Sequence, residues 1–407
     1  MHSYRLELKR KNSVMRIVIS NMKFYHTPYQ VKALLDRDDD NEIRYYSGVR
    51  ARKLNEIFEK KHMCDIQNLS IYTFLSLAYG KICGNFNSQF ELMAYTYFSE
   101  AVSKQIGDNI DIFQAFNGSG RECFSKLKKF GGTKIISECG IHPRFYNDIA
   151  HEESEKYGLK EVLLPQWYVE RSEEEFEMSD YILTQSEICV NSFLKNGVPG
   201  DKIIKLPIGA NLDSYFIGAE CERHFFTQGI LKILFVGRAT VLKGTHLLIE
   251  ACERLKRSGI NIECTVAGPI SDAYIKKLAL KCEDSQTIRF VGKKTTEELK
   301  KLYHEADVMV LPSLMDSTAM VVYESMACGT PVIVSENVGA EVRDGFDGYV
   351  IQTGSVEAIC NKLSFLNEHP DKLYELSRNS LKGVCSKTWR EYSDKLVEIY
   401  DDILRKK

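Results

Sequence analysis

The sequence has no excess of charge of either sign. Its 407 residues carry 54 Lys and Arg against 56 Asp and Glu, which gives a formal net charge of -2 at pH 7. Proteins that bind nucleic acids concentrate Lys and Arg into a basic domain or stripe. The balanced composition gives no support for a nucleic-acid partner, and we expect none.

Long apolar runs are also missing. The most apolar stretch, residues 70–80, is far shorter than the roughly 20 residues that a helix needs to span a bilayer. The first residues, MHSYRLELKRKNS, are polar and lack the apolar core of a secretory signal. We therefore expect a cytoplasmic protein.

The twelve Cys residues contain no C-x-x-C pair, and the sequence has no zinc or haem signature. Most of the cysteines lie in apolar or strand-like surroundings, as free thiols do in a reducing compartment. The sequence thus predicts free thiols and no bound metal ion.

What is present is an alternation of short apolar runs with helical patterns. Hydrophobic residues make up 44% of the chain, enough at this length to bury two cores. The first strand is followed by irregular and helical material to about residue 105, and a last helix is expected from Trp389 to Ile403. The pattern predicts an α/β fold with two domains. The expected strands are residues 15–20, 111–116, 133–138, 181–186, 203–209, 233–237, 263–269, 288–293, 307–312 and 331–335.

Residues 312–331, PSLMDSTAMVVYESMACGTP, are the most informative segment. The run 307–311 before them is apolar and short, as in a buried strand. A helix is expected from about Met320, and Gly329 and Pro331 end it. The segment therefore reads as a strand, a loop and a helix N-terminus.

Two carboxylates flank that helix start. Asp316 lies just before it and Glu324 one turn inside, so both could accept hydrogen bonds from the hydroxyls of a sugar; alternatively, they are two solvated acids. Ser317 or Thr318 could cap the helix. Backbone N–H groups and the helix dipole can hold an anionic group here. The residues expected around that anion are Ser317, Thr318, Ala319 and Met320.

A second segment, residues 231–245, reads LKILFVGRATVLKGT. Its apolar strand ends at Gly237, and Arg238 and Lys243 flank the turn to a helix expected over 245–257. In an open parallel sheet, ligands bind outside the carboxyl ends of the strands. A guanidinium and an ammonium both suit phosphate oxygens, although a solvated basic turn is the other reading.

These residues resemble the retaining nucleotide-sugar glycosyltransferases of family 4, similar to bacterial polysaccharide-type enzymes. The turn at Gly237, Arg238, Lys243 and Gly244 is similar to the family's diphosphate-binding turn. ESMACGTPV, which starts at Glu324, is close to the family's pattern. The resemblance covers nearly the whole chain.

The family's paired acids match Asp316 and Glu324. The resemblance implies that Asp316 contacts the donor sugar and that Glu324 binds the nucleotide ribose. Asp316 replaces the usual Glu, and Ser-Thr-Ala at 317–319 replaces the usual Gly-Phe-Gly. A carboxylate one methylene shorter should reach different sugar hydroxyls, so the donor sugar is left open.

The family has the GT-B fold, in which two Rossmann-like domains face each other across a cleft. The resemblance implies an acceptor-side domain over 1–210 and a domain that binds the nucleotide sugar over 211–384. Residues 385–407 would form a helix that crosses back to the first domain. The segment SECGIHP resembles a family signature in which His142 faces the donor and orients its sugar.

The resemblance further implies a hexosyltransferase that retains the anomeric configuration. The donor would be a UDP- or GDP-sugar, used without a metal or other cofactor, and the acceptor a saccharide or lipid-linked saccharide. The basic segment 121–134 could rest on the inner leaflet of the membrane, which would make the enzyme peripheral, or it could be a solvated helix face. The glycine-rich turn 117–120 could approach a phosphate or simply begin a helix.

Two other classes stay open. The altered residues 316–319 also fit a nucleotide-sugar-binding GT-B protein with little turnover. A GT-B epimerase or phosphorylase is the other alternative, although no motif for a pyridoxal lysine is found. Measured turnover of a nucleotide sugar separates these possibilities.

Overall fold

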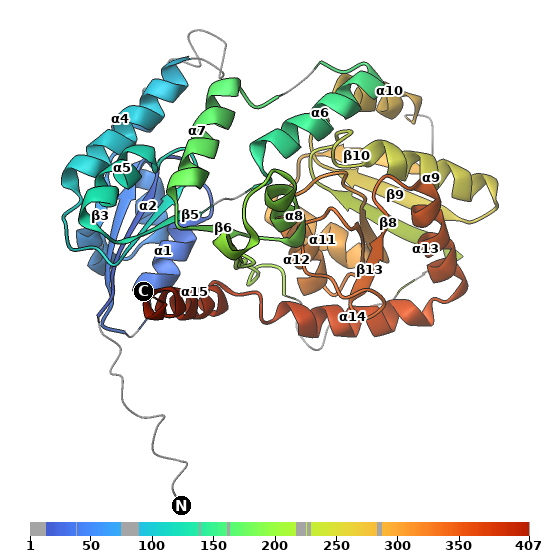
Figure 1. Ribbon diagram of the computed structural model, residues 1–407. Coiled ribbons are helices and arrows are strands. Elements are labelled where there is room, and N and C mark those ends of the chain that lie inside the picture. Colours follow the sequence, from blue (N-terminus) through green and yellow to red (C-terminus); the bar gives the residue numbers. More distant parts are fainter. Residues whose placement is uncertain are drawn as a thin grey trace, which may run out of the picture. The chain divides into compact units, whose positions relative to one another are not determined.

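The structure is a computed structural model that describes most of the chain (Figure 1). The chain divides into two compact units. The first consists of Met1–Glu138, Pro165–Leu183 and Ser393–Lys407, and the second of Cys139–Leu164 and Thr184–Tyr392. The residues described are 14–37, 39–74, 89–137, 140–160, 163–216, 225, 229–282 and 287–406. The predicted domain boundaries at 210 and 384 stay a prediction.

In the described part of the chain, the first sheet has seven strands in the order β3-β2-β1-β4-β5-β6-β7. β1 pairs in parallel with both β2 and β4, so the chain changes direction across the sheet between β1 and β4. Ligands of open α/β sheets bind at such a switch point. The strands are β1 Arg16–Asn21, β2 Glu42–Ser47, β3 Ile66–Asn68, β4 Ile112–Phe116, β5 Thr133–Ser137, β6 Tyr181–Thr184 and β7 Ile203–Lys205.

The expectation of irregular and helical material up to about residue 105 was wrong for β2 and β3. β2 reads EIRYYS and keeps Glu42 and Arg44 exposed, so it lacks a continuous apolar run. β3 has three residues, two of them exposed. β2 forms by pairing with β1, and β3 by pairing with β2, where local pattern gives little signal.

The helices α4, α5 and α7 pack side by side in the first unit (Figure 1). The basic segment predicted over 121–134 is divided, because α5 ends at Phe130 and Lys134 lies in β5. The described helices up to residue 202 are α1 Thr27–Leu35, α2 Ala51–Ile57, α4 Gln89–Gln105, α5 Arg121–Phe130 and α7 Gln166–Met178 of the first unit and α6 Pro143–Tyr157 and α8 Glu187–Lys195 of the second, with short 3-10 turns η1 Lys60–Asp65 and η2 Gly200–Lys202.

A buried carboxylate fills the glycine-rich turn after β4. Glu175 of α7 accepts hydrogen bonds from the backbone N–H groups of Gly118 at 2.6 Å, Gly120 at 2.9 Å and Arg121 at 3.0 Å. Burial raises the pKa of Glu175 to about 7, against the opposing effects of Arg171 and these three amides. The turn at 117–120 therefore does not offer these amides to a phosphate, because an internal acid already takes them.

In the described part of the second unit, the second sheet has six strands in the order β10-β9-β8-β11-β12-β13. Each neighbouring pair of strands in this order runs parallel, and the direction of winding reverses between β8 and β11. The predicted strands are confirmed here, whereas β13 was not predicted. The strands are β8 Leu231–Val236, β9 Ile262–Ala267, β10 Ile288–Gly292, β11 Val308–Leu311, β12 Val332–Ser335 and β13 Gly348–Ile351.

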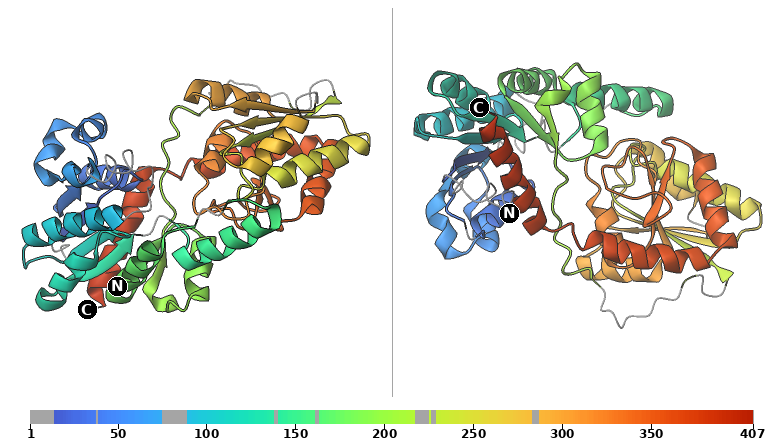
Figure 2. Two further views of the ribbon diagram at one scale, coloured as in Figure 1. Left: turned by 90° about the horizontal axis from the view of Figure 1, so that it is seen from above. Right: turned by 60° about the horizontal axis from the view of Figure 1, so that its bottom comes forward.

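The second sheet is buried between helices. Two helix pairs, α9 with α13 and α12 with α14, pack along each other (Figure 2). The strands β8, β11 and β12 are almost entirely apolar and buried, as expected of a sheet covered on both faces. The helices are α9 Thr245–Arg257, α10 Ala273–Lys281, α11 Thr296–Glu305, α12 Met320–Ala327, α13 Val356–Glu368 and α14 Asp371–Val384.

The last helix, α15 Trp389–Arg405, returns to the first unit from residue 393 onward. Its Tyr400 hydroxyl donates a hydrogen bond of 2.6 Å to Gln114 Oε1 on β4, and Asp394 pairs with Arg37. The expected crossing of a C-terminal helix back to the first half is confirmed.

Among the described helices, none is long and apolar enough to cross a bilayer. The cysteines with free thiols include Cys123, Cys189, Cys252, Cys264, Cys282, Cys328, Cys360 and Cys385.

Candidate donor-binding site

Two turns meet at the switch point of the second sheet, one after β8 and one after β11. The N–H of Leu314 in the second turn donates to Leu242 O in the first at 2.9 Å. Gly244 has φ +71°, and a Cβ there would stand 2.0 Å from Pro312 O. Only glycine permits this approach, so the two turns are held against each other at the point where α9 begins.

The contact brings together two residues that the sequence singles out. Lys243 Nζ forms an ion pair with Asp316 Oδ2. Their side chains retain 28% and 11% of their exposure, so the pair is accessible from solvent. The cation predicted for phosphate and the acid predicted for sugar therefore lie within contact of each other.

The loop 316–318 is held by main-chain bonds on two sides. Gly339 N donates to Asp316 O at 2.7 Å. Ser186 Oγ donates to Ser317 O at 2.8 Å, and the Thr318 hydroxyl bonds Gln185 Oε1. Gln185 and Ser186 were not predicted as site residues. The only available signal was that two polar residues end the predicted strand 181–186.

The prediction that Ser317 or Thr318 caps α12 was wrong. The helix starts after Ala319, and no side chain caps it. The hydroxyl of Thr318 is turned to Gln185 instead. Val322 N donates to Ala319 O at 2.9 Å, so the first-turn N–H groups that can serve an anionic ligand are those of Met320 and Val321.

A methyl group at Gly339 should disturb this loop. A Cβ would stand 1.9 Å from Ser317 O and 2.7 Å from Asp316 O, both backbone atoms that cannot swing away. We expect Gly339→Ala to weaken nucleotide binding by about tenfold or more, since misplaced site groups are costly. Isothermal titration with UDP measures this.

Gly200→Ala is the matched control for that change. A Cβ at Gly200 would meet only Leu194 Cδ2, at an ordinary 3.5 Å. Equal UDP affinity of the two variants would show that Gly339 does not shape the site.

Glu324 is partly buried one turn inside α12. Tyr303 on α11 donates a hydrogen bond of 3.0 Å to Glu324 Oε2, and the Tyr215 hydroxyl also bonds this carboxylate. Burial raises the pKa of Glu324, whereas the two tyrosine hydrogen bonds lower it. No sequence motif marks either tyrosine.

Arg238 and His142 differ in exposure. Arg238 is exposed at the turn after β8, near enough to Tyr146 for its guanidinium to oppose the burial effect that raises the pKa of Tyr146.

His142 is 2% exposed and caps α6, accepting a hydrogen bond of 3.3 Å from Arg144 N at Nδ1. Ile141 beside it packs in one apolar cluster with Met315. His142 thus follows a residue that packs with Met315, and its own contacts include the cap of α6 and edge-to-face packing on Phe193.

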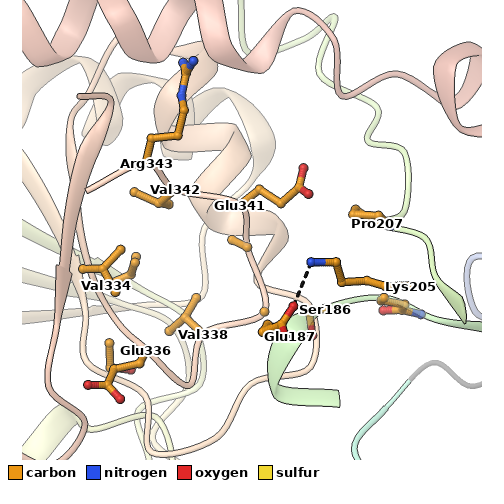
Figure 3. Close-up of a pocket in the computed structure, with 15 residues that line it drawn as sticks. Ser186, Glu187, Lys205, Pro207, Val334, Glu336, Val338, Glu341, Val342 and Arg343 are labelled. Carbon is orange, nitrogen blue, oxygen red and sulfur yellow. Dashed lines mark hydrogen bonds and ion pairs between the residues drawn. The ribbon is translucent and has the colours of Figure 1, made fainter. Parts of the chain in front are cut away.

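A pocket of about 340 Å³ lies behind the same loop (Figure 3). Ser186 and Gly339, which hold the loop 316–318, both line it. Figure 3 shows Lys205 and Glu187 paired at 2.8 Å beside Ser186. Val334, Val338 and Val342 also line the pocket, so it combines apolar and charged surface.

Residues 222–382, within the second unit, match the family of glycosyl transferases group 1. The chain is 28% identical over 202 residues to the amylovoran biosynthesis glycosyltransferase AmsK of Erwinia amylovora, covering 47% of this chain and 49% of that protein. The chain spans about half the length of the curated relatives it matches, or less.

Solved structures show the same fold over nearly the whole chain. Sucrose-phosphate synthase from Thermosynechococcus elongatus superposes with a TM-score of 0.69 at 17% identity, covering 97% of this chain and 100% of that one. HepE from Anabaena, in complex with UDP and glucose, superposes with a TM-score of 0.63 at 13% identity, covering 95% and 100%. The predicted GT-B fold is confirmed.

Proposed function

We propose that this GT-B protein, whose second unit carries a group 1 glycosyl transferase domain, transfers a sugar from a nucleotide-sugar donor to a saccharide acceptor. The observation that carries the proposal is the pairing of Lys243 with Asp316 at the switch point of the second sheet. A phosphate-binding cation and a hydroxyl-binding acid meet there, next to an uncapped helix N-terminus. A nucleoside diphosphate sugar presents both kinds of group.

The residues at this edge can support departure of the nucleoside diphosphate. Negative charge grows on the diphosphate as the glycosidic bond breaks, and preorganised cations and amides stabilise such charge. Lys243, the exposed Arg238 and the first turn of α12 supply them. These groups provide the charge that a divalent metal would otherwise bring, so we propose transfer without a metal.

We further propose that the enzyme belongs with the retaining transferases of family 4. No sequence motif marks a carboxylate as a covalent nucleophile. The acceptor hydroxyl would therefore attack from the face on which the diphosphate leaves, and its proton would pass to the departing diphosphate. Asp316 would hold hydroxyls of the donor sugar, and His142 would orient that sugar.

The donor is proposed to be a UDP-sugar. HepE was solved with UDP-glucose as well as with UDP and glucose, on the same fold. A panel of UDP- and GDP-sugars, incubated with saccharide acceptors with and without EDTA, tests this by mass spectrometry, and NMR of the product gives its anomeric configuration. No turnover of any donor would favour a nucleotide-sugar-binding protein without transfer activity.

The acceptor is proposed to be lipid-linked, with the enzyme in the cytoplasm at the inner membrane face. Large apolar side chains are exposed close to the carboxyl end of β1, where an acceptor of the first unit would bind. Thr73 bonds Met22 O at 2.8 Å and Lys23 pairs with Glu91, which ties three segments of this region together. We call this set the apolar surface of the first unit: Phe24, Tyr25, Ile71, Phe74, Phe90, Met93 and Tyr97.

Positive charge borders the apolar surface of the first unit. Lys53 Nζ lies 5.2 Å from the ring centre of Phe24, and the neighbouring Arg52 side chain is 92% exposed. Apolar side chains next to cations suit a bilayer with anionic lipids. In the predicted basic segment, by contrast, Lys126 donates to Ser103 O at 2.8 Å and Lys134 pairs with Asp180.

Exposed apolar side chains should therefore contribute to vesicle binding. We expect the double change Met93→Ser and Tyr97→Ser on α4 to lower binding to vesicles rich in phosphatidylglycerol by about tenfold or more. Flotation measures it. Leu280→Ser with Tyr374→Ser removes comparably exposed apolar groups of the second unit and serves as the control; equal loss in both pairs would contradict this surface.

A further inference from the structure

Glu324 receives hydrogen bonds from two tyrosines of separate segments. Tyr303 comes from α11, and Tyr215 comes from the chain before β8. A carboxylate offers about four lone-pair positions. Two tyrosine hydroxyls leave about two positions, which is the number that a pair of neighbouring hydroxyls needs.

Both tyrosines are anchored away from their hydroxyls. Tyr303 is fully buried, and its carbonyl accepts a hydrogen bond of 2.5 Å from Thr330 Oγ1. The Tyr215 carbonyl accepts from Cys328 Sγ at 3.2 Å. The two rings pack edge to face, with centroids 6.0 Å apart. The hydroxyls therefore lie at fixed positions relative to α12.

We propose that Tyr303, supported by Tyr215, is a positioning residue for nucleotide recognition, which orients Glu324 so that its remaining lone pairs accept both hydroxyls of the ribose diol. This inference rests on the proposed function, because it assumes that a nucleoside diphosphate binds at this edge. Tyr303 acts through Glu324 and need not touch the ligand. Its consequence is discrimination between a ribonucleotide and its 2'-deoxy form.

The experiment is a cycle that deletes one hydroxyl on each side. UDP and 2'-deoxy-UDP are titrated calorimetrically into the wild-type protein and Tyr303→Phe. We expect the wild type to prefer UDP by about tenfold or more, because a site built to bond a hydroxyl rejects the analogue without it. In Tyr303→Phe the preference should fall to roughly twofold, mainly through weaker UDP binding.

Tyr323→Phe is the matched control. Tyr323 lies on α12 beside Glu324, is 2% exposed, and accepts a hydrogen bond of 3.0 Å from Glu341 N. Losing this hydroxyl should leave the preference for UDP unchanged. If Tyr303→Phe does not fold, Tyr215→Phe gives the same test from the other donor.

The pH dependence of UDP affinity provides a second test, because it would not change in Tyr303→Phe if Tyr303 had only a structural role. Burial raises the pKa of Glu324, and the tyrosine hydrogen bonds lower it, so loss of one hydroxyl raises it further. The titratable groups that bond it are Tyr215, with a pKa raised to about 12, and Tyr303, with a raised pKa, and Cys328 lies near both tyrosines. UDP affinity should thus fall on acidification, and the fall should begin at higher pH in Tyr303→Phe.

The outcomes distinguish failure of the proposed function from failure of the positioning role of Tyr303. A wild-type protein that binds no nucleoside diphosphate would overturn the proposed function. A wild type that prefers UDP, together with a Tyr303→Phe variant that keeps the full preference and the same acid profile, would overturn only the positioning role.

Discussion

Lys243→Ala should lower the rate of sugar transfer by about 10²- to 10³-fold, the usual effect of removing one group that stabilises charge in a transition state. Lys243 extends from the turn after β8 and is the cation paired with Asp316. Its side chain keeps 28% exposure, so the pair should contribute no more than about 1 kcal/mol to folding. A large kinetic loss with an unchanged unfolding midpoint is therefore expected.

Asp316→Asn distinguishes a ligand-binding pair from a structural one. If Lys243 serves the diphosphate, Lys243→Ala weakens UDP binding, whereas Asp316→Asn keeps UDP binding and slows transfer. Lys294→Ala controls for the loss of a surface charge, because Lys294 is 26% exposed and paired with Glu298. If Lys243→Ala behaves like Lys294→Ala, the diphosphate assignment is wrong.

Glu175→Ala should destabilise the first unit by about 3–5 kcal/mol. The substitution leaves the N–H groups of Gly118, Gly120 and Arg121 without their acceptor and leaves Arg171 with one carboxylate fewer beside it. Arg171 is itself fully buried and bonds Glu122 at 2.7 Å. Groups buried without partners account for the size of the effect.

Hydrogen exchange in α5 and β4 measures this local loss, since an unfolding curve of a protein with two units need not be two-state. Glu174→Ala, one residue away, is the control. Glu174 is 52% exposed and pairs with Arg121, so its loss should change stability by no more than about 1 kcal/mol. Protection in Glu175→Ala equal to that in Glu174→Ala would show that the buried acid is dispensable.

Local pattern predicted the second sheet well and the first less completely. α9 was predicted over 245–257 and has those bounds, because apolar periodicity and a glycine start agree there. α12 begins at Met320 as expected, and Gly329 follows its end with φ +67°. β2 was missed, since its exposed Glu and Arg hide its strand character until β1 lies beside it.

The site could be predicted only where its residues directly follow strands of one sheet. Lys243 and Asp316 follow β8 and β11, which are neighbours, so their approach is a consequence of topology. Tyr303 lies in the last turn of α11 and Ser186 follows a strand of the other sheet, where no local motif marks them. The roles of His142 and Glu324 toward a ligand stay predictions.

Because of the Glu175 carboxylate, the two sheets differ in whether the turn at the switch point can accept an anionic ligand. Both have a turn at their winding reversal that could cradle an anion, yet in the first the chain supplies its own occupant. Under the proposed function, we therefore expect one nucleotide to bind per polypeptide, although the two halves have similar architecture.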